Sequence, residues 1–425
     1  EMSRGLGDVY KRQDIFGSEF EKRDFVVQCL KKVYMAFGYD PLQTPAIEFA
    51  EVFTGHHGEG EKLLFRFKDA QGKDLVLRYD MTVPFARFAA VHPELPRPIK
   101  RYQMQMAYRD DAVDKGHFRE FMQCDGDIIG STLLTADADV INLAVAGLSA
   151  VGFTEFVIRI NHRNIIKGIA EELGYKDKEG VLRIQRALDC ADKFGKSQAS
   201  VSDFAQKLRS RGFTDAEIEK INGLVFDSFD VEHPEMLLER TNHNSYVAHG
   251  LAELGEITSY LPRDVLHHCV LDLTLARGAD YYTGFILEGI IPGSGVGAVL
   301  GGGRYDDLVK SCGGTDAGCV GMAFGLDRIC VAMADANMFT KTLNPKILLC
   351  GRRSYATKDL FLRANILRAA GVNCDLCFEF DDKEAALSYA HARHFSGFVW
   401  DDEFVGIGLM SEDLRSKVMP VLMKY

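Results

Sequence analysis

Two long β-prone segments joined by a short polar loop constrain the fold of this sequence more than any other feature. Ile99–Tyr108 alternates between apolar and polar residues, and Phe118–Ile129 continues as a strand after the charged loop Arg109–Gly116. Two neighbouring strands joined in this way pair antiparallel. The sequence therefore predicts a long β-hairpin whose connecting end is polar and carries arginine.

Composition excludes several classes of protein. The 425 residues are 47% hydrophobic and 26% charged, which allows two or three domains with buried cores. No apolar run approaches the roughly 18–20 residues of a membrane-spanning helix, so we expect a cytoplasmic protein with no membrane partner. The net charge of −11 argues against a general nucleic-acid coat but is compatible with a local basic groove. Ten scattered cysteines predict reduced thiols rather than a disulfide framework.

The order of helical and β-prone segments predicts the domain boundaries. Residues 1–13 have no apolar period and read as an artefactual leader outside the fold. A core domain occupies residues 14–175 and resumes at 263–340, and the helix-rich polar stretch 176–262 between them predicts a helical insertion. Over residues 345–425 the elements alternate as βαβαβ, which predicts a small domain with a mostly parallel sheet.

Several individual elements follow from the local pattern. Phe20–Phe37 is apolar at helical spacing and is followed by Gly38, so we expect a helix that ends at this glycine. Leu63–Phe67 and Leu75–Arg78 flank a turn and predict a second hairpin. A further amphipathic helix is predicted over Gly321–Ala334.

Arginines stand at three places suited to phosphate binding. Arg109 and Arg119 fall at the end of the long hairpin, where a guanidinium group donates paired hydrogen bonds to phosphate and stays charged. Arg277 lies inside an otherwise apolar segment, where a buried charge needs a partner. Arg328 is expected near the start of a helix. For each arginine the ordinary alternative is a solvated or structurally paired side chain.

Two further patterns are weaker. Gly301–Asp306 (GGGRYD) would let the backbone approach a ligand, but neither a Walker loop nor a Rossmann glycine motif is present. Cys374 and Cys377 form a C-x-x-C pair that two histidines follow. Because the pair falls in a predicted strand, its side chains point to opposite faces, and we expect no metal site built from side chains.

Six segments match one family in order and spacing. They are Leu77–Pro84 (LRYDMTVP), Tyr108–Asp111 (YRDD), Phe118–Asp125 (FREFMQCD), Leu275–Gly284 (LARGADYYTG), Gly301–Asp306 (GGGRYD) and Gly325–Arg328 (GLDR). Together they resemble the histidyl-tRNA synthetases, a family of class II aminoacyl-tRNA synthetases. The resemblance implies an α+β fold, with a class II antiparallel sheet flanked by helices, a helical insertion and a C-terminal α/β anticodon-binding-like domain.

The resemblance also implies an activity, histidine–tRNA ligase. Such an enzyme activates L-histidine with ATP, in the presence of Mg²⁺, to histidyl-adenylate and pyrophosphate, and then transfers histidine to the 3′ end of tRNA(His). A homodimer is implied as well. The alternative is a catalytically silent, histidine-sensing regulatory subunit of ATP phosphoribosyltransferase. Such paralogues usually lose the phosphate-binding arginines and the C-terminal domain, which this chain keeps, so the sequence favours the ligase.

Roles for individual residues follow from the same resemblance. Arg277 and Arg109 would be catalytic, and Arg109 would contact the α-phosphate and the histidine carboxylate. Arg119 and Arg328 would hold the β- and γ-phosphates, while Phe121 and Arg328 would enclose the adenine. The histidine-binding residues implied are Asp80, Thr82, Gln123, Asp127, Tyr282 and Tyr305.

Some features depart from the family pattern. His117 stands where most relatives have arginine, so a titratable group replaces a permanent charge. Residues 346–425 contain eleven Lys or Arg and eleven Asp or Glu residues, whereas a tRNA-binding surface should be basic. The same region is expected to end without a closing helix.

Overall fold

The computed structural model describes most of the chain and divides it into two compact units. The described residues are 8–9, 12–55, 58–111, 118–191, 198–226, 229, 233–276, 281–339, 344–351, 357–380, 382–401, 403–406 and 412–424. One unit holds residues 1–16 and 26–336, and the other holds residues 17–25 and 337–425. Each unit is described by itself.

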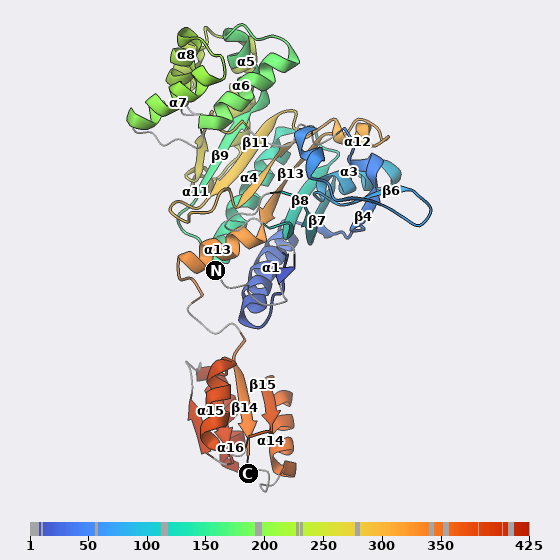
Figure 1. The fold of residues 1–425 in the computed structure, drawn as a ribbon, viewed down its shortest axis with the longest axis vertical. Helices are drawn as coiled ribbons and strands as arrows, with labels where there is room; N and C mark the ends of the chain where they lie inside the picture. The colour runs from blue at the N-terminus through green and yellow to red at the C-terminus, as the bar shows by residue number, and fades with distance from the viewer. Residues whose placement is uncertain are drawn as a thin grey trace. The chain divides into compact units, whose positions relative to one another are not determined.

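An eight-stranded sheet forms the centre of the first unit (Figure 1). Its strand order is β10-β9-β11-β12-β13-β8-β7-β3. The strands are β3 (Asp40–Pro41), β7 (Ile99–Tyr108), β8 (Glu120–Ile129), β9 (Val157–His162), β10 (Cys269–Leu271), β11 (Phe285–Ile290), β12 (Leu300–Arg304) and β13 (Cys319–Gly325). Neighbours pair antiparallel, except for the parallel pairs at the two edges, β10 with β9 and β3 with β7. The predicted long hairpin is confirmed, because β7 and β8 pair along their whole length.

Helices α1 (Ser18–Ala36) and α4 (Leu134–Val151) contribute to the core on one face of this sheet. The Phe324 side chain of β13 meets both of them: its ring lies 6.3 Å from that of Tyr34 in α1, and it packs against Gly147 of α4. The Tyr34 hydroxyl donates a hydrogen bond of 2.7 Å to the Cys124 carbonyl. The opposite face, toward which the neighbouring residue Ala323 projects, is therefore left for the cavity described below.

By length and composition, α4 could cross a membrane, and it is the one helix of this kind in the part of the chain that the structure describes. The expectation that no apolar run reaches this length is therefore wrong for this helix. However, 61% of the stretch is buried inside the protein, where it covers the sheet as a core helix does.

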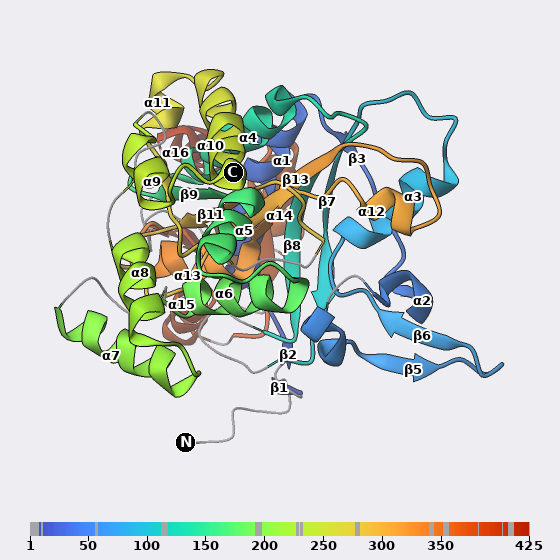
Figure 2. The same cartoon turned by 90° about the horizontal axis from the view of Figure 1, so that it is seen from above.

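A small three-stranded sheet, a two-stranded sheet of β1 (Asp8–Val9) and β2 (Arg12–Gln13), and a group of helices complete the first unit (Figure 2). The small sheet has the order β4-β6-β5, with β4 (Ile47–Phe49), β5 (Arg66–Lys68) and β6 (Asp74–Leu77), and it confirms the second predicted hairpin. The remaining helices are α2 (Ala50–Phe53), η1 (Gly58–Leu63), α3 (Thr82–Val91), α5 (Arg163–Glu172), α6 (Lys178–Ala191), α7 (Gln198–Ser210), α8 (Asp215–Val225), α9 (Glu235–Arg240), α10 (Ser245–Ser259), α11 (Arg263–Leu266), α12 (Leu308–Ser311) and α13 (Leu326–Asp335). Helices α6 to α10 supply the helical structure expected between residues 176 and 262.

The helix predicted over Gly321–Ala334 begins later than expected. Residues up to Gly325 belong to β13, and α13 starts at Leu326. The first residues of the Gly301–Asp306 segment belong to β12, a strand that the sequence pattern does not predict. Strands β12 and β13 lie so close that a Cβ on Gly302 would overlap the Gly321 carbonyl. The start of the predicted helix instead pairs with β12 on one side and β8 on the other. These backbone hydrogen bonds outweigh the local helical pattern of the sequence.

The second unit contains a four-stranded sheet in the order β15-β14-β16-β17. Its elements are β14 (Lys346–Cys350), α14 (Thr357–Ala369), β15 (Asn373–Cys377), α15 (Lys383–Ala392), β16 (Gly397–Trp400), β17 (Glu403–Gly406) and α16 (Glu412–Lys424). The first three strands are parallel, as predicted, and β17 adds an antiparallel edge. The expectation of no closing helix is wrong: α16 buries Leu414 and Val418, one helical turn apart, in this unit's core.

A buried ion pair ties α4 to the sheet and generates a stability prediction. Asp137 is fully buried, and its Oδ1 accepts a hydrogen bond of 2.9 Å from Arg304 Nε on β12. Asp137→Asn removes the fully buried one of the two carboxylates that pair with Arg304, the other being the more exposed Asp306, so we expect the free energy of unfolding to fall by about 3 kcal/mol. Denaturant unfolding followed by circular dichroism measures this change.

Asp139→Asn provides the matched control on the same helix. Asp139 pairs with Lys100 at 2.7 Å, and both side chains are partly exposed. Water already screens this pair, so its loss should cost less than about 1 kcal/mol. Equal losses in the two variants would contradict the assigned importance of the buried pair.

Candidate active site

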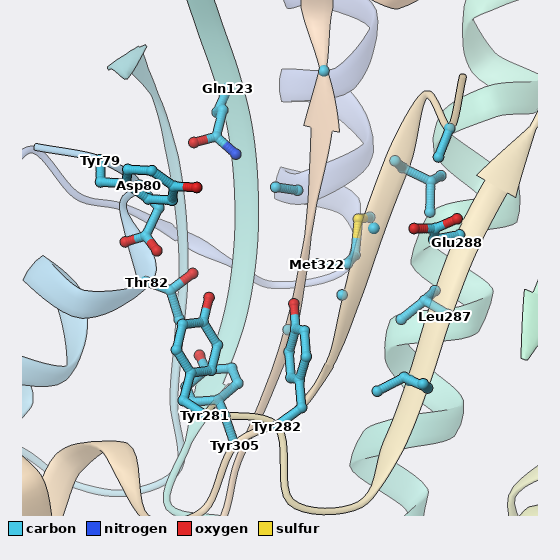
Figure 3. A pocket seen from close by; sticks show the side chains of 18 of the residues that line it. Tyr79, Asp80, Thr82, Gln123, Tyr281, Tyr282, Leu287, Glu288, Tyr305 and Met322 are labelled. Carbon is cyan, nitrogen blue, oxygen red and sulfur yellow. The ribbon is translucent and has the colours of Figure 1, made fainter. Parts of the chain in front are cut away.

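A cavity of about 610 Å³ lies on the face of the large sheet opposite α4 (Figure 3). Its walls come from β8, β11, β12 and β13, from the segment that leads into α3, from Tyr281 and Tyr282, and from α6. The sequence-predicted residues that line it are Asp80, Thr82, Arg109, Phe121, Gln123, Asp127, Tyr282, Tyr305 and Arg328. Segments far apart in the sequence therefore meet in one cavity.

Among the described residues that the sequence predicts for the site, Arg119 does not line the cavity. The Arg119 side chain faces the hairpin loop, where one terminal nitrogen lies 3.2 Å from Asp110 Oδ1 and Nε donates to the Asp111 carbonyl at 3.3 Å. Arg277 lies outside the described residues, as does His117. Of the three predicted arginines that the structure describes, Arg109 and Arg328 line the cavity.

Arg109 is held between two aromatic rings at the end of β7. Its guanidinium carbon lies 4.1 Å from the Tyr79 ring centroid and 5.0 Å from that of Phe121. Nε donates a hydrogen bond of 3.2 Å to the Tyr79 carbonyl. Aromatic faces attract a cation and limit its movement, so this arrangement presents Arg109 to the cavity in a fixed position.

The start of α13 brings Arg328 to the same region. Asp327 accepts a hydrogen bond of 3.2 Å from the Met122 amide of β8, which fixes the helix start beside Phe121. A terminal nitrogen of Arg328 donates to the Ala298 carbonyl at 2.7 Å. The prediction that Arg328 follows the start of a helix is confirmed.

Strand β8 links this arginine-bearing region to the opposite end of the cavity. Phe121, Gln123 and Asp127 are an even number of residues apart along one strand, so their side chains lie on the same face. Six residues at about 3.3 Å each separate Phe121 from Asp127 by about 20 Å along the strand. The cavity therefore has an arginine–aromatic end and an end that contains Asp127.

Asp127 is a buried carboxylate with two fixed partners. The Tyr305 hydroxyl donates to its Oδ1 at 2.6 Å, and a terminal nitrogen of Arg101 lies 2.8 Å from its Oδ2. Burial raises the pKa of Asp127, while Arg101 and the hydrogen bond from Tyr305 oppose that rise. The carboxylate is thus held in one orientation at the wall of the cavity.

Three tyrosine rings gather at this end of the cavity, as Figure 3 shows. The Tyr281 ring lies 5.0 Å from that of Tyr282 and 5.8 Å from that of Tyr305. Burial raises the pKa of all three phenols, so they stay protonated and can donate hydrogen bonds. Tyr281, which also forms a hydrogen bond with Thr82, was not assigned a role from the sequence, although it lies in a matching segment.

Gln123 and Asp80 supply oxygen atoms between the two ends. Gln123 Oε1 is buried and has no hydrogen-bond partner among the residues that the structure describes. Asp80 Oδ1 accepts a hydrogen bond of 3.1 Å from the Val83 amide at the start of α3. A buried acceptor without a partner is costly, so Gln123 fits a ligand that brings a hydrogen-bond donor.

Helix α6 contributes to the cavity, which the sequence did not predict. Leu182, Gln185 and Arg186 of α6 line the cavity. Their spacing of three and four residues places them on one face of the helix. That spacing is visible in the sequence, but it does not tell which neighbouring element the face meets.

The described residues include no group of three or more His, Cys, Asp or Glu side chains that could hold a metal ion. Cys374 and Cys377, the C-x-x-C pair of the sequence analysis, lie in strand β15.

Comparisons with known proteins agree with this geometry. Residues 12–329 match the family model of histidyl-tRNA synthetase. The chain belongs to the histidyl-tRNA synthetase family. A histidine–tRNA ligase of Aeropyrum pernix is 36% identical over 353 residues, which are 81% of this chain and 78% of the relative. One from Cytophaga hutchinsonii is 32% identical and covers 92% of this chain and 91% of the relative.

Solved structures of the family have the same fold. The histidyl-tRNA synthetase of Nostoc superimposes with a TM-score of 0.77 at 23% identity and covers 99% of both chains. A Bacillus halodurans protein, described as an ATP phosphoribosyltransferase regulatory subunit/histidyl-tRNA synthetase, gives 0.74 at 22% identity and covers 94% of this chain and 99% of its own. The family resemblance and the α+β fold expected from the sequence are confirmed.

Gly321 makes room for Asp127 and generates a second prediction. It pairs with Asp127 across β13 and β8, and a Cβ at this position would overlap the Asp127 carboxylate. Gly321→Ala should displace that carboxylate, break its hydrogen bond from Tyr305 and lower the free energy of unfolding by about 1–3 kcal/mol. Denaturant unfolding and a crystal structure of the variant check both effects.

The control for this variant is Gly301→Ala. Gly301 also lines the cavity, but an added Cβ would lie 3.8 Å from its nearest neighbours, an ordinary contact. We expect its unfolding free energy to change by less than about 0.5 kcal/mol. An undisplaced Asp127 in Gly321→Ala would show that the close approach is unimportant.

Proposed function

We propose that this protein is a histidine–tRNA ligase that activates histidine with ATP and transfers it to tRNA(His). The observation that carries the proposal is the oriented Asp127–Tyr305 pair in the same cavity as the arginine–aromatic end. One end suits an imidazole and the other suits a nucleotide. Family membership and relatives named histidine–tRNA ligase support the same activity.

Histidine would bind at the end that contains Asp127. Its imidazole has two nitrogen atoms, and a site that pairs both rejects side chains that lack them. Asp127 would accept from one nitrogen while Tyr282 contacts the ring, with Tyr305 keeping the carboxylate in place. The ammonium group would donate to oxygen atoms of Asp80, Thr82 and Gln123, which gives the buried Gln123 Oε1 its missing partner.

ATP would bind at the other end, where its adenine lies between Phe121 and Arg328. Arg109 would contact both the α-phosphate and the histidine carboxylate, which brings two anions together that repel one another in water. Arg277 keeps the catalytic role that the resemblance implies. Arg119 would reach the β- and γ-phosphates by turning its side chain away from Asp110. Mg²⁺ would arrive on the phosphates of ATP, and Asp111 and Asp327, which line the cavity, suit an ion that needs one or two carboxylates besides phosphate.

The reaction would proceed in two transfers. A histidine carboxylate oxygen attacks the α-phosphorus, the bond to the bridging oxygen of the β-phosphate breaks, and pyrophosphate leaves. A ribose hydroxyl at the tRNA 3′ end then attacks the histidyl carbonyl, and AMP leaves. Arg109 stabilises the charge that develops in the first transfer, a contribution commonly of about 3–4 kcal/mol for such donors.

The regulatory-subunit alternative is not favoured. Arg109 and Arg328 line the cavity, and a second compact unit of α/β structure follows the first. A protein that only senses histidine needs neither. The named relatives at 36% and 32% identity are ligases.

The proposal includes the domain roles inferred from the sequence. Residues 14–175 and 263–340 would form the class II catalytic core, 176–262 a helical insertion, and 345–425 an anticodon-binding-like domain. We place the protein in the cytoplasm, where its tRNA partner is. These assignments rest on the family resemblance.

We also propose a homodimer, which the small three-stranded sheet supports. Phe49 and Phe67 both stand opposite Leu75, so they share a face, and both are exposed, at 48% and 40%. Ile47, two residues before Phe49, is 49% exposed as well. Adjacent exposed apolar side chains on a sheet are typical of an interface, and a second copy would cover them by two-fold symmetry.

Histidine-dependent exchange between ATP and pyrophosphate tests the activity. We expect histidine alone among the amino acids to support exchange, followed by charging of tRNA(His). Asp127→Asn keeps the size but loses the charge that accepts from the imidazole, so the KM for histidine should rise by about 10–100-fold while the KM for ATP stays unchanged. Histidine binding without any exchange would favour the regulatory alternative.

Light scattering tests the dimer. The wild-type chain should have twice the monomer mass at micromolar concentration, and Phe67→Asp should have the monomer mass because a buried, unpaired carboxylate opposes association. Phe361→Asp changes an equally exposed phenylalanine of the second unit and should leave the dimer intact. A monomeric wild type would rule out the proposed interface.

A further inference from the structure

Three consecutive residues at the junction of β9 and α5, Asn161, His162 and Arg163, hold the segment that carries Tyr281 and Tyr282. Asn161 is fully buried, and its Nδ2 donates a hydrogen bond of 3.0 Å to the Leu275 carbonyl. Leu275 comes shortly before Tyr281 in the chain, with residues 277–280 outside the described part. The amide of Asn161 thus fixes the approach to this segment.

Arg163 contacts the segment on both sides. A terminal nitrogen of its side chain donates to the Ala276 carbonyl at 3.3 Å. Its backbone N–H donates to the Gly284 carbonyl at 2.9 Å. One residue therefore connects to the chain before Tyr281 and after Tyr282, so the two flanks cannot move independently of β9.

His162 makes this arrangement rigid. Its backbone N–H donates to Asn161 Oδ1 at 2.8 Å, which orients the Asn161 amide toward Leu275. Its Nδ1 accepts from the Asn164 amide at 3.1 Å and caps α5, and its Nε2 lies 2.7 Å from a carboxylate oxygen of Glu253. The side-chain amide of Asn161 and both ring nitrogens of His162 are thereby engaged, which restricts alternative conformations.

We infer that Asn161 and Arg163 are positioning residues for the histidine pocket. They hold the flanks at residues 275–276 and 284, and so place Tyr281 and Tyr282 at the end of the cavity that contains Asp127. Neither Asn161 nor Arg163 lines the cavity, so both act through the tyrosines. The identity of the ligand rests on the function proposed above, whereas the placement of the segment does not.

Asn161→Asp tests this inference with a small change. The variant keeps the oxygen that accepts from His162 but replaces the donor to Leu275 with a second acceptor. We expect the KM for histidine in pyrophosphate exchange to rise about tenfold and the KM for ATP to change less than about twofold. Hydrogen exchange of a peptide that spans 275–284 should become faster, because its anchoring bond is lost.

Asn244→Asp is the matched control. Asn244 is also buried, and its Nδ2 donates to Glu171 at 3.0 Å at the start of α10, outside the cavity lining. This variant should lower the melting temperature without changing the KM for histidine. Arg163→Gln, which keeps the backbone donor to Gly284, provides a second test should Asn161→Asp fail to fold, and it should raise the KM for histidine while leaving that for ATP unchanged.

The possible outcomes separate this inference from the proposed function. A lower melting temperature with an unchanged KM for histidine in the tested variants would overturn the positioning role. If the wild type catalyses no exchange, the proposed function fails. Calorimetric titration with histidine, together with hydrogen exchange of 275–284, then decides the positioning role: weaker binding and faster exchange support it, and unchanged values overturn it.

Discussion

The buried ion pair between Arg101 and Asp127 is the interaction on which the candidate site depends. Arg101 lies on β7 opposite Asp127 on β8, and its guanidinium group also donates to the Met81 carbonyl at 2.9 Å. The same group lies 4.7 Å from the Phe85 ring of α3. One charge thus joins the central hairpin to the segment that carries Asp80 and Thr82. Because both groups are buried, loss of Arg101 would leave Asp127 without its paired charge, and loss of Asp127 would leave Arg101 with only the more distant Asp125, at 3.9 Å.

The rest of the site is arranged around this fixed point. Tyr305 reaches Asp127 from the loop after β12, and Gly321 of β13 leaves the space that the carboxylate occupies. At the other end of β8, Arg109 is enclosed by aromatic rings. Rigid strands therefore carry the groups that must be aimed, whereas the insertion adds α6 at the margin of the cavity.

Much of this could be predicted from the sequence, because it depends on local pattern. The alternating residues of β7 and β8 predicted a hairpin whose bounds the structure nearly reproduces. The residues matched to the family, among them Asp127 and Arg328, line one cavity. Their roles in binding stay predictions, since geometry places side chains but does not identify ligands.

Other features depend on contacts between distant segments and could not be predicted. Strand β12 is rich in glycine, which disfavours strands locally, and it forms because two neighbours pair with it. The closing helix α16 contains Pro420, so its pattern was weak, yet a hydrophobic core is available to receive it. Arg119 belongs to a matching segment, but its side chain pairs with the loop instead of lining the cavity.

A consequence of building both ends of the cavity on β8 concerns how such a site can change over time. The distance from Phe121 to Asp127 is fixed by the number of residues between them, because an extended strand has a nearly constant rise per residue. Gaining or losing one residue within it would turn every later side chain to the opposite face. The site can therefore be lengthened or shortened only in steps of two residues, so its size is quantised while its surrounding loops remain free to vary.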